Sequence, residues 1–218
     1  MEEMKAAIFD LDGVIVDTVP LHFKAWKRIF SEYGIEFTFD DYKKKVDGIP
    51  RIDGAKAILK DLDEEKLRQV CERKQRYFLE NVSKDKIKTY NSTVNLIKEL
   101  KACGIKVAVI SSSRNLKMIL RKVKLDKIMD AIISGDDIKK GKPDPEVFLT
   151  AADGLGIEPN ECIVFEDAVL GVEAAKRARM VCVGIDRYNN PSRLAKADIV
   201  VSDLAEVDFR RLKELFKK

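Results

Sequence analysis

The sequence contains little of what several classes of protein require. Its four cysteines form no C-x-x-C pair, which argues against a metal cluster, and this sparse use is typical of a reducing compartment such as the cytoplasm. Cys103, Cys162 and Cys182 stand in apolar stretches and are expected in the core. Acidic Asp10 and Asp12 interrupt the first apolar run, so we expect no secretory signal. No apolar run approaches the length that spans a bilayer, so no membrane association is expected.

Blocks of charge of one sign are also missing. The 41 basic and 37 acidic residues are interspersed and leave a net charge of +4. Nucleic-acid-binding arms carry concentrated basic stretches, so we expect no nucleic-acid partner. The chain has no internal repeat and no low-complexity segment. No oligomerisation seam stands out either, and we expect a monomer.

What the sequence does contain is a series of short apolar runs typical of buried parallel strands. The first run, Ala6 to Phe9, ends at Asp10. Segments with helical spacing separate most of the later runs, which predicts a doubly wound parallel sheet from about residue 90 onward. The later runs are residues 107–110, 131–133, 163–165, 181–185 and 199–201.

A different pattern occupies the stretch between the first run and the second. One helical stripe begins near Phe23 and stops at Gly34, a second follows further along, and no strand run separates them. We predict an α/β protein with a Rossmann-like core of residues 1–17 and 87–218. A helical cap domain, residues 18–86, is inserted into that core.

Residues able to bind ligands follow several of the predicted strands. Ligands of open parallel sheets bind beyond the carboxyl ends of the strands, so these side chains are expected to converge. A carboxylate there can attack phosphorus, and a second carboxyl group can transfer protons. Each feature alone has an ordinary explanation in turns, solvated loops or helix caps. The features are Asp10-Leu11-Asp12-Gly13, Ser111 to Ser113, Lys142, and Glu166 with Asp167.

Taken together, these features resemble the four motifs of the haloacid dehalogenase superfamily. The segment from Phe9 to Thr18 looks like the first motif, Ser111 matches the second and Lys142 the third. Glu166 with Asp167 matches the fourth, and all four occur in the right order. The resemblance covers essentially the whole chain. It implies an Mg²⁺-dependent phosphotransferase that works through an aspartyl-phosphate.

The resemblance implies a role for each motif residue. Asp10 would be the nucleophile, Asp12 the general acid and base, and Lys142 the charge that neutralises Asp10 and the phosphate. The cofactor would be Mg²⁺, which prefers oxygen ligands. Its ligands would be the Asp10 carboxylate, the Asp12 backbone carbonyl and Asp167, with Glu166 nearby or ligating. The implied phosphate-binding loop consists of Ser111, Ser112, Ser113, Arg114 and Asn115.

Within the superfamily, the inserted domain resembles the cap of β-phosphoglucomutases. That likeness implies that His22, the only histidine, is a hinge or relay residue that affects when the general acid can act. Gly48, Arg51 and Lys74 match cap positions that handle the sugar and its second phosphate. From the residues alone, His22 would be a polar residue on an amphipathic helix and Arg51 a surface charge.

Three functions are open, and the resemblance ranks them. A sugar-phosphate mutase comes first, and a phosphatase that hydrolyses a small phosphorylated sugar comes second. A catalytically silent sensor comes last, because its class would lose Asp10, Asp12 or Lys142, and all three are present. A dehalogenase is disfavoured, since such members lack the second aspartate. Asp47 argues against the first choice, because the mutase pattern has a lysine there and a carboxylate repels phosphate.

One departure from the resemblance concerns folding. Arg179 stands where relatives place a glycine that ends a helix. A left-handed arginine there would cost roughly 1–2 kcal/mol relative to glycine.

Overall fold

The structure is a computed structural model that describes residues 3–46 and 49–217. The chain divides into two compact units, Met1–Asp17 with Lys88–Lys218, and Thr18–Ile87. We call the first the core unit and the second the helical unit. The assignment of the helical unit as a cap stays a prediction.

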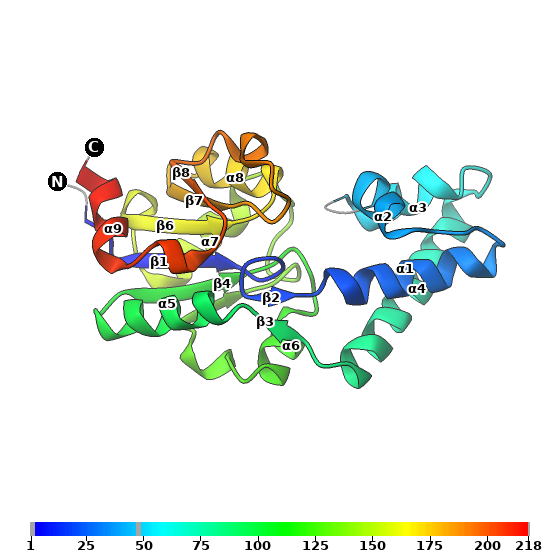
Figure 1. Cartoon of the computed structure of the whole chain (residues 1–218), viewed down its shortest axis with the longest axis horizontal. Coiled ribbons are helices and arrows are strands. Elements are labelled where there is room, and N and C mark those ends of the chain that lie inside the picture. The colour runs from blue at the N-terminus through cyan, green and yellow to red at the C-terminus, as the bar shows by residue number, and fades with distance from the viewer. Residues whose placement is uncertain (1–2, 47–48, 218) are drawn as a thin grey trace. The chain divides into compact units, whose positions relative to one another are not determined.

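The core unit contains a six-stranded sheet in the order β5-β4-β1-β6-β7-β8, and every neighbouring pair of strands is parallel (Figure 1). All six apolar runs form strands, so the predicted doubly wound α/β fold is confirmed. Because β1 lies in the middle of the sheet, its side chains are buried on both faces, which explains the unbroken apolar run. The strands are β1 Ala6–Asp10, β4 Lys106–Ile110, β5 Ala131–Ile133, β6 Cys162–Glu166, β7 Val181–Ile185 and β8 Ile199–Val201.

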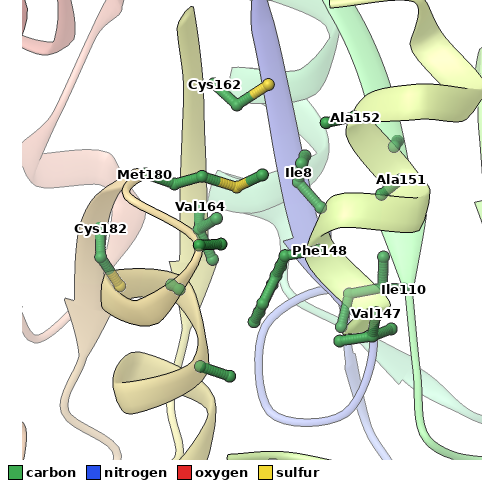
Figure 2. Packing of buried hydrophobic residues seen from close by; sticks show 14 of the residues in the cluster. Ile8, Ile110, Val147, Phe148, Ala151, Ala152, Cys162, Val164, Met180 and Cys182 are labelled. Atoms are coloured by element: carbon green, nitrogen blue, oxygen red, sulfur yellow. The ribbon is translucent and has the colours of Figure 1, made fainter. Parts of the chain in front are cut away.

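Helices follow the strands and cover the sheet. On one face, alternate strand residues such as Ile8 and Val164 pack with Phe148 of α7 and with residues of α8 (Figure 2). On the opposite face, Phe9 stacks on Phe165 with ring centroids 4.4 Å apart. The helices are α5 Asn91–Ala102, α6 Leu116–Lys122, α7 Glu146–Leu155, α8 Val169–Arg177 and α9 Phe209–Glu214. The 3-10 turns are η1 Asp126–Ile128, η2 Pro159–Glu161, η3 Pro191–Leu194, η4 Leu204–Glu206 and η5 Leu215–Lys217.

The core unit also contains a small second sheet that the sequence did not predict. Strands β2 Val16–Asp17 and β3 Lys88–Thr89 pair antiparallel, directly beside the two points where the chain enters and leaves the helical unit. Two-residue strands are too short to produce an apolar run or an alternating pattern, so periodicity does not detect them.

The helical unit consists of α1 Val19–Glu32, α2 Phe39–Lys45, α3 Arg51–Ile58 and α4 Glu64–Lys84. Helices α1 and α4 pack along each other, and the stripe on α1 supplies Trp26 and Phe30, whose stacked rings lie 5.2 Å apart in the core of this unit. Thr38 and Asp41 form a capping box that begins α2. Asp47 and Gly48, which the sequence analysis singled out, lie outside the described residues.

The structure tests the expected burial of three cysteines and the expected backbone conformation of Arg179. Cys162 and Cys182 are buried in the core as expected, but the expectation for Cys103 was wrong. Cys103 is exposed because it is the C-cap of α5, in the exposed turn that leads into β4. Arg179 follows α8 with φ of 59°, so the left-handed conformation is retained without glycine. Within residues 3–46 and 49–217, no helix is both long and apolar enough to cross a membrane.

Candidate active site

Asp10 is the last residue of β1 and is held at both carboxylate oxygens. Its Oδ1 accepts a hydrogen bond from Lys142 Nζ at 2.6 Å, and its Oδ2 accepts one from the backbone N–H of Asp12 at 2.9 Å. The side chain is only 8% exposed. The central strand therefore places a buried carboxylate in a fixed orientation at the carboxyl edge of the sheet.

The loop after β1 turns sharply at Gly13. This residue has φ of +79°, and a Cβ atom there would lie 2.0 Å from Asp167 Oδ2. Both the conformation and the close approach exclude a larger side chain. The Gly13 N–H donates to the Val16 carbonyl at 2.8 Å, which closes the turn. The turn brings the first and fourth sequence motifs into contact.

Lys142 lies between two carboxylates. Its Nζ is 2.6 Å from Asp10 Oδ1 and 2.6 Å from Glu166 Oε2, and its side chain is 12% exposed. Burial disfavours the ammonium, but the attraction of the two carboxylates is larger and raises the pKa of Lys142 above its usual range. Lys142 is therefore a permanently charged group at this site.

Glu166 ends β6, and Asp167 follows it. Burial raises the pKa of Glu166 to about 7, although the Lys142 ammonium opposes the shift. Burial, followed by the neighbouring Glu166 and Asp10 carboxylates, raises the pKa of Asp167 well above its usual range. Gly171 in α8 makes room for this arrangement, since a Cβ atom there would lie 2.0 Å from Glu166 Cδ. The site thus holds more carboxylates than its one ammonium can neutralise.

The donor atoms at this cluster fit a small divalent cation. One oxygen each from Asp10, Glu166 and Asp167 lies within 4.8 Å of the others. The set offers only carboxylate oxygens, the ligands that Mg²⁺ prefers, and burial together with repulsion from neighbouring carboxylates raises the pKa values of Glu166 and Asp167. A cation would relieve that repulsion.

The loop after β4 approaches the general acid proposed by the resemblance. Ser111 is buried, and its hydroxyl donates to Asp12 Oδ2 at 3.2 Å while accepting from the Ser113 N–H at 3.0 Å. The Asn115 N–H in turn donates to Ser113 Oγ at 3.2 Å. This chain of hydrogen bonds fixes a compact loop beside Asp12.

Two residues of the same loop point elsewhere. Ser112 is exposed. Arg114 is 80% exposed, and its Nε lies 3.0 Å from Asp136 Oδ1 on the loop after β5. Arg114 therefore already has an anionic partner within the protein, which the sequence did not reveal because Asp136 belongs to no motif.

In the helical unit, His22 and Lys74 form a contact of their own. Lys74 Nζ lies 2.7 Å from His22 Nδ1, and the imidazole stacks on Phe78 with ring centroids 4.0 Å apart. Burial, the Lys74 charge and the Arg51 charge hold the pKa of His22 well below its usual range. Since an ammonium can only donate, the neutral Nδ1 accepts and Nε2 carries the proton.

Lys74 and Arg51, two of the predicted helical-unit residues, have different surroundings. Lys74 is 3% exposed and lies over the rings of Trp26 and Phe78, at 5.3 and 5.2 Å from their centroids. Arg51 begins α3 and is exposed. The roles of these residues toward a substrate stay predictions.

Comparison with known proteins places this geometry in a family. The family model described as haloacid dehalogenase-like hydrolase matches residues 7–185, which include all four motifs. The chain belongs to the haloacid dehalogenase-like hydrolase family. It is accordingly an enzyme of the haloacid dehalogenase type.

The relatives of this family member include both mutases and phosphatases. The β-phosphoglucomutase of Bacillus subtilis is 37% identical over 220 residues, covering 97% of this chain and 95% of its own. The phosphorylated carbohydrates phosphatase of Thermotoga maritima is 35% identical over 191 residues, covering 84% of this chain and 83% of its own. The crystal structure of β-phosphoglucomutase from Clostridium difficile has a TM-score of 0.82 and 30% identity, covering 98% of this chain and 97% of that one.

In the haloacid dehalogenase fold, most of the site residues predicted in the core unit lie together, and so does one further residue that the sequence analysis did not single out. Asp10, Asp12, Ser111, Lys142 and the Glu166–Asp167 pair are linked through the contacts above. Sequence reasoning did not notice Arg187, whose Nε donates to the Gly13 carbonyl at 2.8 Å. Arg187 follows β7 at the carboxyl edge of the sheet, and that position is the signal that could have found it.

Proposed function

We propose that this chain is a Mg²⁺-dependent phosphotransferase that forms an aspartyl-phosphate on Asp10. The supporting observation is Lys142 Nζ, which lies 2.6 Å from both Asp10 and Glu166 in a cluster of carboxylates suited to a cation. Phosphoryl transfer needs little covalent chemistry beyond a nucleophile and depends mainly on positioning and neutralisation of charge. The cluster offers these features in one place.

The proposed reaction has two balanced steps. In the first, an Asp10 carboxylate oxygen attacks phosphorus, the bond to the leaving oxygen breaks, and Asp12 gives its proton to that oxygen. In the second, an acceptor hydroxyl attacks the same phosphorus, Asp12 takes its proton, and the bond to Asp10 breaks. Ser111, which bonds Asp12 Oδ2, keeps the acid and base beside the nucleophile.

The residues that would hold Mg²⁺ are Asp10, Asp167 and the Asp12 backbone carbonyl, with Glu166 beside them or ligating. When bound, the ion supplies positive charge that neutralises these carboxylates and the oxygens of the transferring phosphoryl group. Lys142 contributes a second positive charge. Its hydrogen bond to Asp10 Oδ1 and the bond from the Asp12 N–H to Asp10 Oδ2 together fix the orientation of the Asp10 carboxylate.

We propose a small phosphorylated sugar as the substrate and rank isomerisation above hydrolysis. The support is the similarity to the Bacillus subtilis β-phosphoglucomutase, together with Arg51, Arg114 and Asn115, which match mutase positions that the resemblance assigns to phosphate. A guanidinium binds phosphate through two parallel hydrogen bonds. A mutase must hold two phosphate groups at once, so it needs basic residues beyond those at the nucleophile.

A phosphatase for a small sugar phosphate is the second candidate. The exposed Arg114–Asp136 ion pair favours it, since a carboxylate competes with a second phosphate for that guanidinium. Asp47 adds a further negative charge at a position where the mutase pattern has a lysine. The phosphatase of Thermotoga maritima shows that a sugar phosphatase occurs among the relatives.

A product assay separates the two candidates. Wild type and Arg51→Ala are given β-glucose 1-phosphate with a trace of glucose 1,6-bisphosphate, and glucose 6-phosphate and free phosphate are measured in parallel. One lost charged contact is worth on the order of 2–3 kcal/mol, so Arg51→Ala should lower isomerisation roughly 30- to 150-fold and change slow ester hydrolysis little. Lys56→Ala, another exposed cation on α3, is the matched control. Release of free phosphate alone, unaffected by Arg51→Ala, would establish the phosphatase instead.

A further inference from the structure

Arg187 reaches from the segment after β7 to the turn that follows the nucleophile. Its Nε donates to the Gly13 carbonyl at 2.8 Å, and the side chain is 15% exposed. Strand β7 lies two positions from β1 in the sheet, so the arginine spans the end of the intervening β6. Gly13 is next to Asp12 in the chain and lies against Asp167, which makes its carbonyl a central point of the site.

The guanidinium is oriented from several sides. Its central carbon lies 3.8 Å from the centroid of the Tyr90 ring, a stacking distance. Nη1 donates to the Ser202 carbonyl at 3.4 Å and lies 3.7 Å from Asp203 Oδ2. Tyr90 itself donates its N–H to the Ile15 carbonyl at 3.0 Å, so it holds the same loop at a second point. Arg187 and Tyr90 thus support the loop as a unit.

The other hydrogen bonds of the loop described above come from Thr93 and Tyr90, from Ser111 after β4, or from the loop itself. Thr93 Oγ1 of α5 donates to the Val14 carbonyl at 2.7 Å, and the Gly13 N–H donates to the Val16 carbonyl at 2.8 Å. The contact from Arg187 comes from the β7 side. Without it, the loop would stay bonded to α5, but the Gly13 carbonyl would lose the hydrogen bond and charge that fix its direction.

Stability alone is a poor reason for an arginine at this position. Among the described residues, Arg187 Nη2 has no hydrogen-bond partner although it is buried. A buried donor without an acceptor is destabilising, and an apolar side chain of similar length would cover Tyr90 without that disadvantage. An apolar side chain could not reproduce the charged donor to the Gly13 carbonyl, which is the shortest of the polar contacts of this guanidinium.

We propose that Arg187 is a positioning residue that fixes the Gly13 peptide and through it the direction of Asp12 beside Asp10. This proposal rests on the proposed phosphotransfer, because Asp12 is assigned there as the acid and base. Arg187 acts through the loop and does not contact the reacting atoms. Its removal should therefore slow the chemical step and leave binding of substrate nearly unchanged.

The kinetic test compares Arg187→Met with a matched arginine on the same segment. Arg193 also stacks on a tyrosine, with its central carbon 4.4 Å from the Tyr188 centroid, but it is exposed in η3 and makes none of the loop's hydrogen bonds described above. With p-nitrophenyl phosphate and with β-glucose 1-phosphate in Mg²⁺, Arg187→Met should lower kcat roughly 10- to 100-fold with little change in KM. Arg193→Met should match wild type, and Arg187→Lys should recover part of kcat because an ammonium can still donate to a carbonyl.

Hydrogen exchange supplies a readout that needs no activity. Amide exchange of the peptide covering residues 11–16 should be faster in Arg187→Met than in wild type and unchanged in Arg193→Met. If wild type neither turns over phosphate esters nor acquires phosphate on Asp10, the proposed function fails, while this measurement still decides the role of Arg187. Unchanged kcat with unchanged exchange in Arg187→Met would overturn the proposal. So would an equal effect of Arg193→Met. If Arg187→Met does not fold, the same two measurements on Arg187→Lys decide.

Discussion

Each unit of this protein buries a lysine, and the two lysines are stabilised by different physics. In the core unit, Lys142 lies 2.6 Å from each of two carboxylates. In the helical unit, Lys74 lies 2.7 Å from a neutral imidazole nitrogen and over two aromatic rings. The first lysine sits in a site with an excess of negative charge. The second adds positive charge to a site whose histidine stays neutral.

The two sites differ in how they respond to added positive charge. The core cluster has three carboxylates around one ammonium, so it gains from an added cation. In the helical unit, burial and the Lys74 charge disfavour protonation of His22, so added positive charge is unfavourable there.

The largest expected effect comes from removing the two lysines in turn. Lys142→Met leaves Asp10 and Glu166 buried without their shared ammonium, and should lower the free energy of unfolding by about 3–5 kcal/mol at pH 8 without metal. Lys74→Met loses its hydrogen bond to His22 Nδ1 and its contacts with aromatic faces, and should cost less, about 1–2 kcal/mol. Urea denaturation of both variants measures the difference. Equal losses would show that the two lysines are held by the same kind of interaction.

A second prediction concerns the metal. The raised pKa values mean that folded Glu166 and Asp167 bind protons that the unfolded chain releases, so the stability of the metal-free core falls as pH rises from about 4.5 to 7. Mg²⁺ should therefore raise the melting temperature more at pH 8 than at pH 5.5. Asp167→Asn relieves the repulsion, so it should stabilise the metal-free protein by on the order of 1 kcal/mol and lose the response to Mg²⁺. Thermal unfolding of wild type and Asp167→Asn, with and without Mg²⁺ at the two pH values, tests these expectations. A full Mg²⁺ response in Asp167→Asn would contradict the assignment of Asp167 as a metal ligand.

The helical unit should respond to pH in the opposite direction. The pKa of folded His22 is depressed, so below about pH 6.5 the unfolded chain binds a proton that the folded chain does not. Stability from this group is complete above pH 6.5 and is lost as pH falls, by at most about 1.4 kcal/mol per pH unit. His22→Gln keeps an acceptor for Lys74 and should remove this slope. Because His22 is the only histidine, an unchanged slope in the variant would assign the effect to other groups.

The fold was predictable where the physical signal is local. Buried parallel strands produce continuous apolar runs, and all six runs became strands of the main sheet. The convergence of Asp10, Ser111, Lys142 and Glu166 followed from the rule that ligand sites form at the carboxyl ends of strands. The family resemblance added chemical roles, and these remain predictions until activity is measured.

The features that escaped prediction all depend on contacts between distant parts of the chain. Strands β2 and β3 pair although the whole helical unit lies between them in the sequence, and both are too short to produce a periodic pattern. Arg187 meets Gly13 from 174 residues away, and Arg114 meets Asp136 on another loop. An arginine in a loop fits an ordinary surface position, so only the fold reveals the partners of Arg187 and Arg114.

The most direct test of the account is the site of phosphorylation. Wild type is mixed with Mg²⁺ and a phosphorylated sugar, quenched in acid and treated with borohydride, which reduces an aspartyl-phosphate to homoserine. We expect homoserine at position 10, none without Mg²⁺, and neither homoserine nor turnover in Asp10→Asn. Phosphate on another residue, together with an active Asp10→Asn, would contradict it.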